Sequence, residues 1–402
     1  MDQFNNRDGK SQKYLGDRGL LVLIAVFSAF VPLSTDLYLP ALPGMGDYFG
    51  VSADLTNLTL ILFFIFYSLG LLFWGPLSDR YGRRPVLLIG LALYIAASVG
   101  CAASWEIRPL IAFRILQAVG GSAASAVATA MIKDLYEGRK QESVLALVQS
   151  MVVTAPAVAP LLGAFMLPYT SWRGLFVTLA LIGVVAMIGG LLLEETIPAR
   201  RTDTVAQSVR RLGVVLKNPG FASLLIVFSL VSTASLAFVS ASSYIYEKGF
   251  GLSEQVYSFY FALNAIGLIS GPFLYIWLSR HFSRRVIVGF SFGVMIAGGV
   301  LVCLFGSLGP LIFALALLPA SLMGSSVRPG GAFLMLDQQK GDTGSASALI
   351  NCSALVFGSV GMVLVFLGGN NLVFSLGAIN VAVGVACLLG WVLIGRMDLV
   401  RC

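Results

Sequence analysis

The chain has 402 residues, of which 57% are hydrophobic and only 11% are charged. Soluble domains carry about 25% charged residues, so this composition excludes an ordinary soluble protein and indicates lipid as the surrounding solvent. The formal net charge of +7 would suit a nucleic-acid partner, but the positions of the basic residues give it another explanation below.

Apolar segments long enough to cross a membrane recur along the whole chain. A spanning helix needs roughly 20 apolar residues. The first apolar run follows 18 polar residues and has no small-residue cleavage site close behind it, so we read it as an uncleaved span rather than a signal peptide. The criterion predicts twelve spans, at 19–42, 55–77, 85–104, 109–132, 142–167, 173–193, 219–246, 255–278, 286–306, 310–336, 344–368 and 372–395.

The longest polar stretch, from Glu194 to Lys217, divides the spans into two groups of six. It contains the segment ARRTDTVAQSVRR, which favours a short helix on the membrane surface. The predicted parts are a cytoplasmic N-terminal segment (1–18), an N-terminal six-helix half (19–193), a cytoplasmic linker (194–218), a C-terminal six-helix half (219–396) and a tail (397–402).

The basic residues are distributed unequally between the two sides of the membrane. The segments on the side of the termini carry 21 of the 26 lysines and arginines, and the opposite loops carry three. Because Lys and Arg concentrate in cytoplasmic loops, both termini are predicted to be cytoplasmic, in a multi-pass protein of the cell's inner membrane. This asymmetry explains the net charge without a nucleic-acid partner.

An internal repeat supports the division into halves. PLSDRYGRRPV (76–86) and WLSRHFSRRVI (277–287) align at an offset of 201 residues, and four positions are identical. Each segment lies between the second and third span of its half. Two parallel halves with such a repeat are typical of secondary transporters.

The first copy closely resembles the signature loop of the major facilitator superfamily, G-x-L-[SA]-D-R-x-G-R-[RK]. The resemblance implies an all-α membrane protein with twelve helices in two pseudo-symmetric halves. It also implies that this cytoplasmic loop acts as a latch between the halves in the outward-facing state. The latch residues that match are Gly75, Asp79, Arg80, Gly82, Arg83 and Arg84, together with Leu77.

Three further motifs resemble those of drug:proton antiporters. RILQAVGGSAASA (114–126) is similar to the fourth-span motif R-x-x-Q-G, with Ala118 in place of glycine. TAPAVAPLLGAF (154–165) is similar to the fifth-span antiporter motif, where Pro160 and Gly163 match. STDLYLPALP (34–43) resembles the first-span signature of the bicyclomycin/chloramphenicol resistance (Bcr/CflA) subgroup.

Asp36 is the acid within the first predicted span, and Arg114 is the base within the fourth. A carboxylate deep in a membrane costs about 2.5 kcal/mol or more. Both residues lie roughly 8–9 Å from the same side at 1.5 Å per residue, and each lowers the cost of burying the other. We therefore expect a pair, in which Asp36 binds the coupling proton and Arg114 tunes its affinity. The alternatives are a static bridge, or Asp36 as a cap near the interface.

Helical spacing extends this pair into a predicted surface. Ser28 and Pro32 share a face with Asp36, and Gln117, Gly121 and Ser125 share one with Arg114. Tight helix packing is the simpler reading for several of these positions. The predicted substrate cavity comprises Ser28, Tyr38, Gln117, Gln149, Pro156, Asn264 and Arg328, and the antiporter-motif helix comprises Pro156, Pro160 and Gly163.

The resemblance predicts an apolar residue at position 328 in the tenth span, where this chain has Arg328. Pro329 and Gly330 follow it and would loosen the helix. The guanidinium is suited to a carboxylate or phosphate of the substrate. Pairing with Asp337, or reaching to the cytoplasmic surface, are equal alternatives.

These observations predict a proton-coupled exporter of a small organic molecule that works by alternating access. The chain has one histidine, His281, and no C-x-x-C or G-x-x-x-x-G-K-[ST] sequence, so we expect no metal, no cofactor and no ATP hydrolysis. The rivals are a proton-coupled symporter that imports a nutrient or anion, an intramembrane enzyme or receptor, and a channel. Sequences such as H-E-x-x-H are absent, so no enzyme is expected. The expected partners are the substrate and the lipid bilayer, around a monomer.

Overall fold

Long helices joined by short turns make up the computed structural model, which describes residues 16–197, 205–339, 343–369 and 371–397. Within these ranges the chain has no strand. The N-terminal half comprises α1 (Gly16–Asp36), η1 (Leu39–Ala41), α2 (Leu42–Phe49), α3 (Ala53–Tyr81), α4 (Arg83–Ala103), α5 (Ile107–Leu135), α6 (Gly138–Met166) and α7 (Trp172–Leu192). The C-terminal half comprises α9 (Pro219–Ser243), η2 (Tyr244–Gly249), α10 (Glu254–Leu278), α11 (Arg284–Phe305), η3 (Gly306–Leu308), α12 (Pro310–Asp337), α13 (Thr343–Leu367) and α14 (Leu372–Arg396).

Eleven helices of the described residues are long and apolar enough to cross a membrane, and a bent pair supplies a twelfth. Their bounds lie within about four residues of the predicted spans, apart from the first. The first predicted span, 19–42, corresponds to this bent pair: the chain bends by 42° between Gly19–Phe30 and Pro32–Phe49, and the pair extends to Phe49. Pro32 has no N–H to donate and its ring crowds the preceding turn, which explains a bend at this point.

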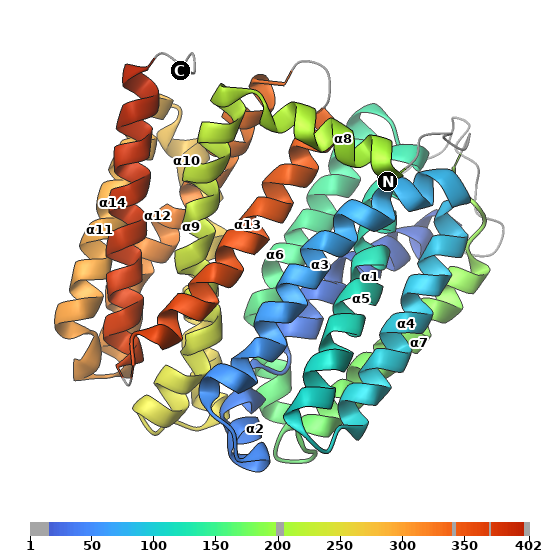
Figure 1. Cartoon of the computed structure of the whole chain (residues 1–402), viewed down its shortest axis with the longest axis horizontal. Coiled ribbons are helices and arrows are strands. Elements are labelled where there is room, and N and C mark those ends of the chain that lie inside the picture. Colours follow the sequence, from blue (N-terminus) through green and yellow to red (C-terminus); the bar gives the residue numbers. More distant parts are fainter. Residues whose placement is uncertain (1–15, 198–204, 340–342, 370, 398–402) are drawn as a thin grey trace.

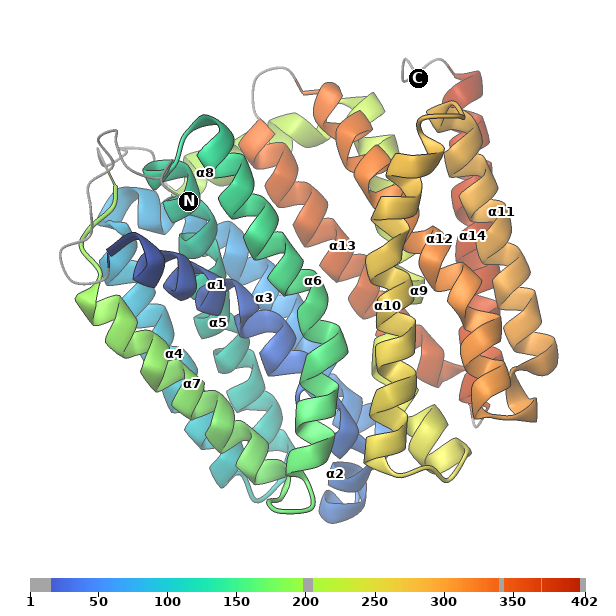
Figure 2. The same cartoon turned by 180° about the vertical axis from the view of Figure 1, so that it is seen from behind.

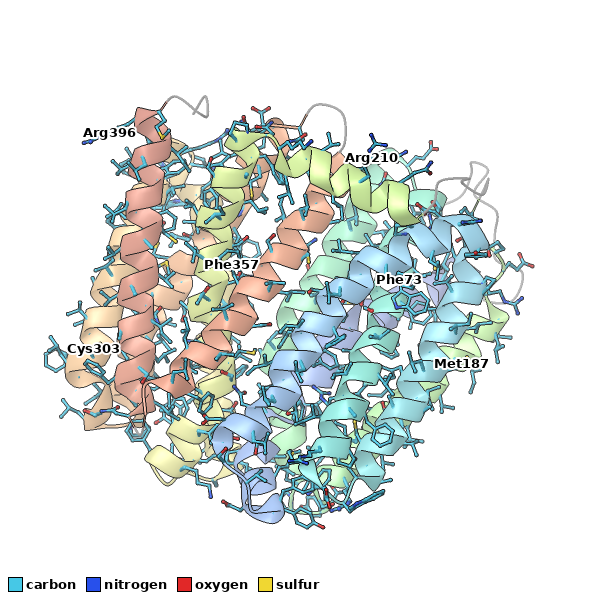
Figure 3. All side chains as sticks on the ribbon, in the orientation of Figure 1. Phe73, Met187, Arg210, Cys303, Phe357 and Arg396 are labelled. Atoms are coloured by element: carbon cyan, nitrogen blue, oxygen red, sulfur yellow. The ribbon has the colours of Figure 1, made fainter. Side chains whose placement is uncertain are left out.

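The two halves lie side by side, and α8 (Val205–Leu216) runs across one end of them (Figure 1). This helix falls where the sequence favoured a short surface helix, although residues 198–204 lie outside the described part. We call the end where α1 begins and α14 ends the terminal end, and the end that carries α2 and η2 the α2 end. Arg210 on α8 and Arg396 on α14 both lie at the terminal end (Figure 3).

The halves meet at the α2 end and diverge toward the terminal end (Figures 1 and 2). Between them α3 packs against α13, and α6 packs against α10. Polar contacts join the halves at the α2 end: Asn57 donates to the Met362 carbonyl at 3.2 Å, Gln255 donates to the Ala164 carbonyl at 3.0 Å, and Lys248 pairs with Asp47. The Lys248–Asp47 pair is exposed and contributes little, so the buried amide of Asn57 is the more significant contact.

The repeat seen in the sequence extends to the closest helix contacts. A Cβ on Gly163 of α6 would overlap the Leu37 carbonyl, whose carbon lies 2.9 Å away. A Cβ on Gly361 of α13 would likewise overlap the Thr233 carbonyl, with its carbon at 2.7 Å. These glycines occupy corresponding places in the two halves. Each lets a helix press against the backbone of the first helix of its half, and Leu37 directly follows Asp36.

Gly163→Ala should therefore destabilise the protein by about 1–3 kcal/mol, because a backbone carbonyl cannot move aside without shifting the end of α1. Gly293→Ala in α11 is the matched control, since its Cβ would meet nothing within 4 Å and alanine favours a helix. The measurement is the midpoint of thermal unfolding in detergent. Equal midpoints for the two variants would contradict this packing argument.

Candidate functional site

Arg114 lies at the centre of a buried polar network in the N-terminal half, and its side chain is fully buried. Its Nη1 donates to the Ser34 carbonyl at 2.9 Å and to Gln117 Oε1 at 2.6 Å, and its Nε donates to the Thr59 carbonyl at 3.4 Å. Gln117 in turn donates to Ser98 at 2.7 Å. Because Ser34 belongs to the last turn of α1, the guanidinium holds the end of that helix, where a cation is favourable.

Two aromatic rings enclose the guanidinium. Its carbon lies 4.4 Å from the ring centre of Tyr38 and 4.3 Å from that of Phe63, with Phe176 at 5.7 Å. Such contacts stabilise a desolvated cation by about 2 kcal/mol. One nitrogen, Nη2, is buried and has no hydrogen-bond partner. The pocket therefore holds a buried cation that retains an unused donor.

Asp36 ends α1 and is buried, with 5% of its surface exposed. Its Oδ1 accepts a hydrogen bond from Thr35 at 3.0 Å. The next element, η1, packs against α6 of its own half and against α9 and α10 of the other half. Asp36 is therefore placed where the two halves meet.

The expected Asp36–Arg114 ion pair is absent from the described residues in this conformation. The depth estimate was correct in bringing both residues to the end of α1, since Arg114 binds the carbonyl of Ser34, two residues before Asp36. It was wrong about the contact itself. The helix ends at Asp36 rather than at Leu42, and the depth of a residue along a helix does not fix which way its side chain points around the axis.

The predicted cavity residues fall into different environments. Tyr38 and Gln117 are fully buried against Arg114 and face no open space here. Ser28 bonds to the Ile24 carbonyl of its own helix, and Pro156 is partly buried in α6. The side chain of Gln149 lies outside the described part. For these positions a role in substrate binding stays a prediction.

Two cavity candidates come from the C-terminal half. Asn264 in α10 is buried and donates to Ser321 of α12 at 2.9 Å. Arg328 of α12 is exposed, and among the described residues nothing accepts a hydrogen bond from it or pairs with it. The expected alternative of an Arg328–Asp337 pair is therefore not formed.

The signature loop forms a network within the N-terminal half. Arg83 binds Asp79 at 2.5 Å and Asp134 at 2.8 Å. Glu195, just after α7, accepts from the backbone N–H groups of Arg83 at 2.9 Å and Arg84 at 3.4 Å, so it caps the start of α4. Gly82 has a φ of +108°, and a Cβ there would press on the Glu195 carboxylate. Glycine is required here because the backbone has a positive φ and because the Glu195 carboxylate leaves no room for a Cβ.

The remaining latch candidates make weaker contacts. Arg84 donates to the Leu191 carbonyl at 2.8 Å, and Arg80 is exposed over the Tyr81 ring. Gly75 has no atom within 4 Å of the position of a Cβ. Among the described residues, Asp79 and Arg83 form no hydrogen bond or ion pair with the other half, in line with halves that are apart at this end.

Sequence reasoning missed several residues of these networks. Ser34 stands at the start of the STDLYLPALP motif but was not chosen, and neither were Glu195 and Asp134. Glu195 gave no usable signal, because the N–H groups that it accepts from lie more than 100 residues earlier in the chain. Phe63 and Phe176 gave no signal that distinguished them from other apolar residues.

A bundle of membrane-spanning helices in two halves is the architecture of a multi-pass membrane transporter. The family model of the Major Facilitator Superfamily matches residues 22–362, and the chain belongs to this family. Its membership of the Bcr/CflA-type drug exporters accords with its curated relatives.

Relatives of similar length support this placement. The chain is 30% identical to the uncharacterized MFS-type transporter YdgK of Bacillus subtilis, over 85% of this chain and 87% of that one. It is 30% identical to a chloramphenicol resistance protein of Pseudomonas aeruginosa, over 92% and 90%. It is 28% identical to the multidrug resistance protein MdtL of Escherichia coli, over 72% and 74%.

Solved structures share the fold at low identity. A peptide transporter crystallised with sulfate aligns with a TM-score of 0.78 at 13% identity, over 98% of both chains. A bacterial homologue of the human lysosomal transporter Spinster aligns with a TM-score of 0.76 at 15% identity, over 98% of this chain and 99% of that one.

Glu195→Ala should lower stability by about 1–2 kcal/mol, because it leaves two N–H groups at the start of α4 without their acceptor. Glu106→Ala is the control, since Glu106 stands at the start of α5 without a side-chain cap. Thermal unfolding of the purified variants tests this difference. A Glu195 variant as stable as the Glu106 variant would contradict the capping role.

Proposed function

We propose that the protein exports a small organic molecule in exchange for protons, and that Asp36 binds the coupling proton. The observation that carries the proposal is a carboxyl that is buried without a counter-charge at the junction of the two halves. Burying an unpaired charge costs several kcal/mol. Protonation removes that cost, so closure of the two halves around η1 and proton uptake by Asp36 favour one another.

Arg114 provides the partner for the other state of the carboxyl. Its unused Nη2 is a donor within the same network that holds Ser34. When Asp36 loses its proton, movement of the end of α1 toward Nη2 of Arg114 would bring the carboxylate and the guanidinium into an ion pair. The proline-bent α1, together with Pro156 and Pro160 in α6, provides the helix flexibility that such a movement needs. Proton loss is thereby coupled to a change in the contact between α1 and α6.

The proposed orientation places the terminal end in the cytoplasm of the inner membrane, as the basic residues indicate. The structure then corresponds to an inward-facing state, closed at the α2 end. The protein would act as a monomer, with protons as the coupling ion and no other cofactor. The rival is a proton-coupled symporter on the same fold, which differs in the sign of the pH change when substrate is added to energised inverted vesicles.

Asp36→Asn should reduce proton-linked export to the level of vesicles that lack the transporter, because the amide keeps the shape but cannot bind the proton. Inverted vesicles with a pH-sensitive dye measure this exchange, with chloramphenicol as a neutral probe and 4-hydroxycinnamate as an anionic one. Asp54→Asn is the control, since Asp54 is an exposed acid in the first turn of α3. Antiport makes the vesicle lumen less acidic when substrate is added outside. Full exchange by the Asp36 variant would end the proposal, as would a lumen that becomes more acidic.

Asp79→Asn should slow turnover more than it weakens substrate binding. The neutral side chain of asparagine cannot form the ion pair with Arg83. In the proposed cycle this ion pair breaks and re-forms as the two halves move. Transport rates at saturating and limiting substrate separate the two effects. A variant with weakened binding and unchanged maximal rate would count against the latch.

A further inference from the structure

Arg328 is an exposed cation within a membrane helix. It lies nine residues before α12 ends at Asp337. A charge at such a position is costly unless it is paired or hydrated. In the described part of the chain it has neither a hydrogen bond nor an ion pair. Its environment therefore has to supply water or a ligand.

The side chain faces away from the lipid side of α12. Leu315 and Phe333 are 53% and 51% exposed and mark that side. At 3.6 residues per turn, Arg328 lies about 140° around the helix from each of them. Gly324 and Ser321, four and seven residues earlier, share its face and lie against residues of α9 and α10.

This face of α12 adjoins α9 and α10, two of the helices through which the C-terminal half contacts the N-terminal half. Of the helices that surround α12, α10 packs against α6, and both α9 and α10 pack against η1. Arg328 also belongs to the part of α12 nearer the terminal end, where the halves diverge (Figure 2). The guanidinium is therefore exposed on the side from which a cytoplasmic substrate would enter between the halves.

Asn264 of α10, beside this face of α12, has a buried oxygen without a hydrogen-bond partner. Asn264 is 3% exposed, its Oδ1 has no hydrogen-bond partner, and its Nδ2 is occupied by Ser321. Asn264, Ser321 and Ser235 line a cavity of about 10 Å³. That volume holds roughly one water molecule or hydroxyl group. The unused acceptor thus adjoins a space for a single small donor.

The spacing of the two groups limits the ligand. Arg328 lies two helical turns, about 10 Å, after Ser321. Ser321 is the residue that accepts the hydrogen bond from Asn264. Side chains on a helix incline toward its N-terminal end, so the guanidinium approaches Asn264 and shortens this distance. A flat molecule of one or two rings can reach both groups.

We propose that the transported substrate is an organic anion, whose carboxylate or phosphate binds Arg328 and whose hydroxyl or amine donates to Oδ1 of Asn264. Guanidinium groups bind such anions through paired, charge-assisted hydrogen bonds. This inference rests on the proposed function as an exporter, and it names the substrate class of the same protein. It distinguishes this chain from a transporter of neutral hydrophobic drugs.

The test uses three matched probes on the purified full chain: 4-hydroxycinnamate, its uncharged amide, and cinnamate, which lacks the hydroxyl. The midpoint of thermal unfolding reports binding without any proton gradient. We expect 4-hydroxycinnamate to stabilise the protein most, the amide least and cinnamate to an intermediate degree. Arg328→Gln should weaken binding of the carboxylate by about tenfold to hundredfold, whereas Arg328→Lys should retain most of it.

Arg396→Gln is the control for loss of a positive charge, because Arg396 is exposed at the terminal end (Figure 3). It should bind all three probes as the wild type does. Equal stabilisation by acid and amide, no stabilisation by any probe, or an Arg328→Gln variant that still prefers the acid would each overturn the proposal.

Charge reversal gives a second measurement. Arg328→Glu should lose the preference for 4-hydroxycinnamate and gain one for 4-hydroxyphenethylamine, provided size-exclusion chromatography shows a folded protein. A folded Arg328→Glu variant that still prefers the acid would contradict a direct contact. Binding by Asp36→Asn should keep the preference for the acid, so a failure of proton coupling and a failure of the anion site give different results.

Discussion

Burial of the Arg114 guanidinium without a counter-charge is the constraint on which the N-terminal half depends. Five hydrogen-bonding and aromatic neighbours satisfy most of its surface. Four of them come from α1, α3 and the chain just after α1, and the fifth, Gln117, comes from α5 itself. The cation thereby determines where α1 ends. Because Asp36 is the last residue of that helix, the position of the carboxyl follows from the burial of the guanidinium. One donor is left over, and the arrangement is therefore suited to a second state in which a charged Asp36 takes it.

The pseudo-symmetric glycine contacts explain how this arrangement is transmitted to the rest of the bundle. Gly163 presses α6 against the backbone after Asp36, and Gly361 makes the corresponding contact in the C-terminal half. Packed helices without room for even a methyl group move together rather than deform. A shift at the end of α1 therefore reaches α6, and from α6 it reaches α10 across the interface. The C-terminal half exposes Arg328, so proton binding at Asp36 and the proposed anion binding lie in different halves.

Much of this fold could be predicted from the sequence, because apolar length and basic-residue placement are direct consequences of the bilayer. Eleven spans and the division into halves follow from these two features. The bend at Pro32 could not be placed, since apolar composition continues unbroken through it. The Asp36–Arg114 pair was predicted from depth alone, and depth does not fix the direction in which a side chain points around its helix. Glu195 and Asn264 show the same limit, because their roles depend on partners more than 50 residues away in the chain.

The central claim is that Asp36 binds a proton in a buried site between the halves. Labelling with dicyclohexylcarbodiimide, which modifies protonated carboxyls in apolar surroundings, tests it most directly when the labelled residue is identified by peptide mass spectrometry. The account predicts that Asp36 is labelled, that the labelling falls as the pH is raised, and that exposed Asp54 is not labelled. Absence of label at Asp36 at every pH, or equal labelling of Asp54, would contradict it.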